Sequence, residues 1–169
     1  MRELRFPVTR EQVDALEVGE TILISGRILC GRDAVLPRIA RSIEDGTWDT
    51  QGIDLQGSLI FHTAVSVAGV GPTSSNKKDI ESTIPILSEH GVRMHLGKGE
   101  LSAQTIAELD AYHSVYAVIP PVTALLRSKT LSQRVVAFEE EGMEALHELD
   151  VDKFPAVVAA VHGRSIYGE

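Results

Sequence analysis

The chain has 169 residues, 43% of them hydrophobic, and its 24 acidic and 16 basic side chains give a formal net charge of -8. This length predicts one domain, residues 1–169, and the acidic balance disfavours nucleic acid as a partner because such binding needs Lys and Arg to neutralise phosphates. The charged start, MRELRFPVTREQ, lacks an apolar signal region, and no apolar run approaches the ~20 residues of a membrane span. We therefore expect a cytoplasmic protein with no membrane partner.

The apolar pattern alternates between extended runs and helical spacing, which predicts an α/β domain with a mixed, partly parallel sheet. Thr9 and Gln12 form a capping-box pattern that predicts a short first helix, with a polar surface turn as the alternative. Residues 20–30 (ETILISGRILC) are rich in β-branched side chains, and they predict a strand bent or bulged at Gly26.

Helical and extended segments alternate through the middle of the chain. Residues 32–45 have helical spacing with Pro37 in the first turn or at a kink, and residues 58–64 (SLIFHTA) predict a second strand. Residues 65–78 are small and polar, as in a binding loop. The later predictions are helices from Asp79 to His90, at 101–112 and at 120–128, and strands at 92–96 and 114–119.

The C-terminal third contains strand-like runs at 134–138 (RVVAF), 144–149 (EALHEL) and 156–161 (AVVAAV), separated by short polar links. These runs predict separate strands that extend the same sheet or build a second one.

Residues 69–79 (GVGPTSSNKKD) gather hydroxyls, backbone donors and two lysines just before a predicted helix start. Unpaired amides and the helix dipole favour anions at such a place. The spacing fits neither the phosphate-binding GxxxxGK loop nor the GxGxxG dinucleotide motif. A carboxylate or similar small anion is therefore the expected ligand, and a solvated polar turn that caps the helix is the alternative.

Two further basic residues follow predicted strands, at the strand ends where open α/β sheets bind ligands. Arg32 lies in GRD (31–33) and Lys98 in GKG (97–99). Because Arg can hold a carboxylate bidentately and Lys acts as a compact charge, Arg32, Lys77 and Lys98 together could fix a dicarboxylate. The alternatives are a surface ion pair between Arg32 and Asp33 and a solvated turn at Lys98.

In this order, GRD (31–33), GPTSS (71–75) and GKG (97–99) resemble the C-terminal domain of class I fumarases and the β-subunit of tartrate dehydratases, which are iron–sulfur hydro-lyases. The resemblance extends from about Val18 to Ile166. It implies a swivelling β/α/β domain that pairs with a larger α-subunit. The assembly could be a homodimer or an α2β2 complex. The resemblance further implies that the α-subunit carries a 4Fe-4S cluster on three cysteines, whose open iron acts as a Lewis acid for the loss of water.

The resemblance also implies roles for residues of this chain. Thr73 would lie beside the carbon that loses its proton, as the base or next to it, and a neighbouring cation would have to stabilise its alkoxide. The implied substrate-binding residues are Arg32, Asp33, Ser74, Lys77 and Lys98. Two positions depart from the family pattern: Lys77 replaces an arginine, and Leu36 replaces a common histidine. Because of these two departures, the resemblance does not determine which hydroxy acid is the substrate.

The favoured function is therefore reversible hydration or dehydration of a hydroxy-dicarboxylate, with fumarate/malate ahead of tartrate and another hydroxy acid as a further choice. A non-catalytic carboxylate-binding or regulatory module and a purely structural subunit are the alternatives. Cys30 is the sole cysteine, so this chain alone forms no intramolecular disulfide and holds no cluster that needs several thiolates. His62 could orient a ligand, or it could be a core or edge histidine with one hydrogen bond.

Overall fold

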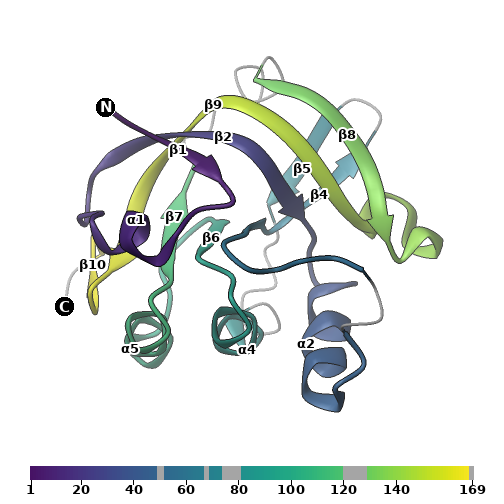
Figure 1. Cartoon of the computed structure of the whole chain (residues 1–169), viewed down its shortest axis with the longest axis horizontal. Helices are drawn as coiled ribbons and strands as arrows, with labels where there is room; N and C mark the ends of the chain where they lie inside the picture. Colours follow the sequence, from purple (N-terminus) through teal and green to yellow (C-terminus); the bar gives the residue numbers. More distant parts are fainter. Residues whose placement is uncertain (49–51, 67–68, 74–80, 120–128, 168–169) are drawn as a thin grey trace.

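Parallel strands dominate the main sheet of the computed structural model, which describes residues 1–48, 52–66, 69–73, 81–119 and 129–167 (Figure 1). In sheet order the parallel strands are β1 (Arg2–Phe6), β2 (Thr21–Cys30), β3 (Leu59–Phe61), β6 (Met94–Gly97) and β7 (Val115–Val118). The antiparallel members are β8 (Thr130–Ala137), β9 (Leu146–Val161) and β10 (Arg164–Ser165). The α/β class with a mixed sheet is thus confirmed.

Strand β9 closes the sheet on itself, because it pairs with β2 and also with β7. The circuit β2–β3–β6–β7–β9 encloses apolar side chains that include Ile24, Phe61 and Phe154. Two separate strands were predicted where β9 runs, and that prediction is wrong. The polar link between the two runs continues the strand, since Asp150 pairs with Arg27 of β2.

The bend predicted at Gly26 is confirmed. The register between β2 and β9 shifts between Ile24 and Gly26, and Gly26 has φ 94°. A Cβ at this position would lie 2.5 Å from the carbonyl oxygen of Phe6, on the neighbouring strand β1. Glycine therefore allows both the positive φ and the close approach of the two backbones.

Helices α2 (Leu36–Asp45), α4 (Ile84–Glu89) and α5 (Ala103–Ala111) lie on one side of the sheet (Figure 1). Helix α2 begins later than predicted. Pro37 has no N–H and fits only the first turn, while the N–H groups of Val35 and Leu36 bond to the Arg32 carbonyl at 3.1 and 2.9 Å. The described helix α4 likewise has its proline in the first turn.

A separate two-stranded hairpin, β4 (Thr63–Ser66) and β5 (Gly69–Thr73), follows β3. The predicted strand 58–64 is therefore divided between two sheets, with β3 in the main sheet and β4 in the hairpin. The prediction of a loop at 65–78 is wrong at Gly69–Thr73, which form strand β5. Small side chains and glycines gave no alternation signal there. Residues 74–78 and the helix predicted at 120–128 lie outside the described residues.

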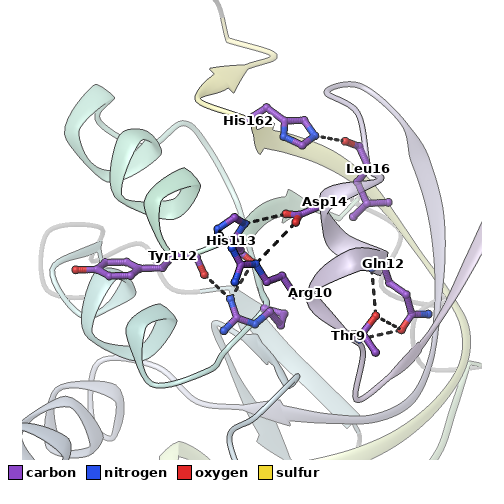
Figure 2. Close-up of polar contacts among 9 residues, drawn as sticks. Thr9, Arg10, Gln12, Asp14, Leu16, Tyr112, His113 and His162 are labelled. Carbon is purple, nitrogen blue, oxygen red and sulfur yellow. Dashed lines mark hydrogen bonds and ion pairs between the residues drawn. The ribbon is translucent and has the colours of Figure 1, made fainter.

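Helix α1 (Arg10–Asp14) joins β1 to β2, and its predicted capping box is confirmed by reciprocal bonds between Thr9 and Gln12 (Figure 2). The far end of α1 is tied to the segment that precedes β7, where His113 Nδ1 lies 3.2 Å from Asp14 Oδ1. Arg93, just before β6, donates to the carbonyl oxygens of Tyr112 and His113. The contacts of Arg93 and His113 lie at the amino ends of β6 and β7. No helix in the described part of the chain is long and apolar enough to cross a membrane.

Candidate functional site

The carboxyl ends of β2, β3 and β6 form one continuous edge. The N–H of Gly31 bonds to the Phe61 carbonyl at 3.0 Å, and the N–H of His62 bonds to the Leu96 carbonyl at 2.8 Å. These two bonds extend the parallel pairing one residue beyond each strand. Arg32, His62 and Lys98 therefore follow neighbouring strand ends, at the edge where α/β sheets bind ligands.

Tight packing holds the turn that carries Arg32. A Cβ at Gly31 would lie 2.7 Å from Val35 Cγ2 and 3.4 Å from Leu146 Cδ1, so only glycine fits between α2 and the start of β9. The Arg32 carbonyl accepts the first hydrogen bonds before α2. The backbone of Arg32 is thus fixed by its neighbours on both sides.

The Arg32 guanidinium already has a carboxylate partner. Its Nε donates to Glu144 Oε1 at 3.1 Å and its Nη2 donates to Glu144 Oε2, which is a bidentate, side-on pair. Asp33 Oδ1 lies 3.8 Å from the same Nε. Hydrogen bonding to Glu144, followed by the charges of Glu144 and Asp33, raises the pKa of Arg32 above its ordinary value, and burial opposes this rise.

The GKG turn is supported from the neighbouring strand. Lys98 is exposed, and it forms no ion pair with the part of the chain that the structure describes. The Tyr116 hydroxyl donates to the Gly99 carbonyl at 2.9 Å, and a Cβ at Gly97 would lie 3.2 Å from that hydroxyl. Burial raises the pKa of Tyr116, so the phenol stays protonated and remains a donor. Tyr116 therefore fixes the backbone that presents Lys98.

The hairpin brings the backbone of Thr73 to the same edge. Thr73, the last residue of β5, pairs with Thr63, and Thr63 follows the edge residue His62. The Thr73 side chain is outside what the structure describes, as are Ser74 and Lys77. Of the predicted site residues, Arg32, Asp33, Lys98 and the Thr73 backbone are placed along the carboxyl edge.

His62 is a buried polar residue within this edge. It is 5% exposed, and its Nε2 has no hydrogen-bond partner among the described residues. Its ring centroid lies 5.9 Å from that of His95, whose Nε2 is 2.8 Å from Ser88 Oγ. Burial lowers the pKa of His62 to about 4, so the ring is neutral at physiological pH. The burial of His62 agrees with the sequence interpretation of a core or edge histidine, and the one hydrogen bond of that interpretation stays a prediction.

Within the part of the chain that the structure describes, no ligand set for an iron–sulfur cluster is formed. Cys30 is fully buried in the enclosed core, and burial raises the pKa of its thiol. Among the described residues, no group of three or more His, Cys, Asp or Glu side chains could hold a metal ion. Leu36, where the resemblance implies a histidine, is the first residue of α2 and is fully buried in a cluster with Leu29 and Ile39. It belongs to the core and not to the edge.

Two residues of the site were missed by sequence reasoning. Glu144 lies 112 positions from Arg32, within the acidic run EEEGME, and nothing in that run distinguishes it from its neighbours. Tyr116 lies in a predicted strand and reaches Gly99 across 17 positions. Only the strand order brings these residues to the edge.

Comparison with known proteins gives consistent similarities along the whole chain. The family described as Fumarase C-terminus matches residues 2–169. A Methanocaldococcus jannaschii protein provisionally named L(+)-tartrate dehydratase subunit beta is 27% identical over 96% of this chain and 89% of its own length. The L(+)-tartrate dehydratase subunit beta of Escherichia coli is 24% identical over 98% of this chain and 86% of its own. A Geobacillus stearothermophilus protein provisionally named class I fumarate hydratase is 29% identical over 97% of this chain, which spans 33% of that protein.

Proposed function

The chain belongs to the fumarase C-terminus family, and from this premise we propose that it is the small subunit of a two-subunit hydro-lyase. The proposed reaction is the reversible hydration or dehydration of a hydroxy-dicarboxylate, with fumarate/malate as the first choice and tartrate as the second. The relatives' names support this class of reaction, since they are hydratases and dehydratases. Two of the relatives are named as beta subunits, which supports a separate partner.

The observation that carries the proposal is the position of two cations along the carboxyl edge. Arg32 follows β2 and Lys98 follows β6, with β3 between them. Neighbouring strands lie about 4.8 Å apart, so the two strand ends are separated by roughly 10 Å. Long cationic side chains from these ends can close around a four-carbon dicarboxylate and hold one carboxylate each.

Thr73 is the proposed catalytic residue, beside the carbon that loses its proton. A neutral threonine hydroxyl is a weak base, so it needs a nearby cation to stabilise its alkoxide. Lys98 and Lys77 are the proposed cations, and Asp33 and Ser74 complete the proposed substrate-binding set. The backbone pairing of Thr73 with Thr63 supports this arrangement because it brings residue 73 near the strand ends.

The partner subunit is proposed to carry a 4Fe-4S cluster that supplies a Lewis acid for the departing hydroxyl. The buried Cys30 supports this division of labour. The chain's own task in the proposal is to bind and orient the carboxylates and to exchange a proton at Thr73. A swivelling movement of this domain against the partner belongs to the same proposal.

Reconstitution tests the proposed function directly. The chain is co-expressed with a candidate cluster-bearing α-subunit, loaded with iron and sulfide without oxygen, and assayed for fumarate, malate and tartrate conversion beside each subunit alone. We expect turnover only in the mixture, with light scattering showing α2β2 or a smaller complex. A stable, cluster-loaded complex with no turnover of these acids would reject the proposed substrates, and it would favour another hydroxy acid or a binding role.

A further inference from the structure

Glu144 belongs to a short segment that ion pairs and a cation–π contact attach to helix α2. It ends the 3-10 segment η2 (Glu139–Glu144), which Phe138 enters with φ 59°. Arg38 of α2 lies over the Phe138 ring, 4.2 Å from its centroid, and pairs with Glu140 at 3.2 Å and with Glu141 at 3.4 Å. These contacts connect the η2 segment to the helix that begins just after Arg32.

The residues that follow Glu144 are also fixed. Ala145 is 1% exposed, and its N–H bonds to the Gly142 carbonyl at 3.0 Å. Leu146 is fully buried and begins β9 against the Gly31 turn. Glu144 and Arg32 therefore both extend from constrained backbone, and each side chain is 26% exposed where they meet.

The pairing occupies one particular edge of the guanidinium, formed by Nε and Nη2. A guanidinium is planar and rigid, so a carboxylate bound side-on fixes the direction of the whole group. A second carboxylate can then bind bidentately only across the two terminal nitrogens. Glu144 therefore sets the direction from which Arg32 can receive another carboxylate.

We propose that Glu144 is a positioning residue that orients Arg32 so that the substrate carboxylate binds end-on, across Nη1 and Nη2. This inference rests on the proposed function and adds a specificity-determining residue to the same site. The opposite role is a competitor, in which Glu144 takes the place of the substrate carboxylate. The two roles predict opposite signs: loss of a positioning carboxylate weakens dicarboxylate binding, whereas loss of a competitor strengthens it.

The test compares E144Q and E144D with the control E140Q in the assembled two-subunit complex. Glu140 lies on the same segment as Glu144, but its ion pair is with Arg38 and not with Arg32. The E140Q substitution still leaves Arg38 paired with Glu141. The readouts are kcat and KM for the substrate and the Kd of succinate, a four-carbon dicarboxylate with no hydroxyl to lose, by calorimetry. Thermal midpoints of all variants are measured alongside.

For E144Q we expect KM and the succinate Kd to rise about tenfold with kcat within threefold of the wild type, because the guanidinium loses its charged anchor. E144D should recover part of the loss, and E140Q should stay within twofold. Unchanged or tighter succinate binding in E144Q would overturn the inference. If E144Q fails to assemble with the partner, unchanged or tighter succinate binding in E144D would overturn it. Absence of turnover of fumarate, malate and tartrate by the wild-type complex would reject the proposed substrates, while succinate calorimetry would still decide the role of Glu144.

Discussion

The two ends of the parallel strands carry similar polar residues but connect them differently. At the amino ends, Arg93 donates to the carbonyls of Tyr112 and His113. His113 in turn lies beside Asp14 of α1 (Figure 2). At the carboxyl ends, Lys98 is exposed and forms no ion pair with the described residues, and the buried Nε2 of His62 has no hydrogen-bond partner among them. A buried unpaired group lowers stability, and Ser114 Oγ at the amino end of β7 is another such group, so the difference between the edges rests on the exposed charge of Lys98 and on the bonds that Arg93 makes to the segment before β7. We infer that the amino edge anchors the fold and the carboxyl edge serves binding.

The largest effect expected from this difference is at Thr73. In the assembled complex, Thr73→Val removes the proposed proton-transfer group while keeping the side-chain volume, so kcat should fall by about 10²-fold or more. Thr21→Val is the matched control, because Thr21 is exposed at the amino end of β2. Steady-state kinetics with equal thermal midpoints would support the assignment, and kcat within fivefold of the wild type would remove Thr73 from the mechanism.

A smaller effect is expected for Arg32→Lys. Lysine keeps the charge but loses the planar fork that Glu144 now holds, so kcat/KM should fall roughly 10- to 100-fold, mainly through KM. Arg134→Lys, in an exposed pair with Glu148, is the control and should change kcat/KM by less than twofold. Equal kinetic constants for the two variants would show that the carboxyl edge has no special role.

Substitutions at the amino edge should lower the stability of the fold without changing activity. Arg93→Met removes two donors from backbone carbonyls, and we expect the free energy of unfolding to fall by about 2 kcal/mol. Arg41→Met, at an exposed position of α2, should change it by less than about 0.5 kcal/mol. Urea denaturation measures both values. A loss of kcat in folded Arg93→Met at saturating substrate would contradict the separation of the two edges.

The smallest effect concerns pH. Folded His62 has a pKa of about 4, below the ordinary 6.5, so the unfolded chain binds more protons between these values. Stability is therefore full above about pH 6.5 and is lost as pH falls toward 4, by roughly 1.4 kcal/mol between pH 7.5 and 5.5 for this group. His95 adds a loss of the same sign, since its pKa is also lowered by burial.

Denaturation of His62→Gln at both pH values tests this account. The variant should show a weaker decline than the wild type by about 1.4 kcal/mol, whereas His90→Gln, at the partly exposed C-cap of α4, should keep the full decline. An undiminished decline in His62→Gln would show that the buried imidazole is not the titrating group.

Sequence patterns predicted most of the local structure because its causes are local. The capping box at Thr9, the bend at Gly26 and the strand at β7 each depend on neighbouring residues, and each is confirmed. The hairpin of β4 and β5 was missed because glycine and small side chains hide alternation. The continuity of β9 was missed because a polar stretch looked like a link, although the strand is paired there with β2.

The residues of the candidate site also fall into those that local sequence patterns predicted and those that they could not. Turns after strands predicted that Arg32 and Lys98 would share one edge, and the parallel pairing of β2, β3 and β6 brings them there. Glu144 could not be predicted, because its contact with Arg32 depends on how β9 closes the sheet over a separation of 112 residues. Such long-range pairs leave no periodic signal in one sequence.

Hydrogen–deuterium exchange on the assembled complex, with and without saturating succinate, tests the central claim most directly. We expect added protection in peptides that contain Arg32, Thr73 and Lys98, and none in the peptide that contains Tyr112 and His113. Protection confined to the amino edge, or bound succinate that protects none of the three site peptides, would contradict the proposal that the carboxyl edge binds the dicarboxylate.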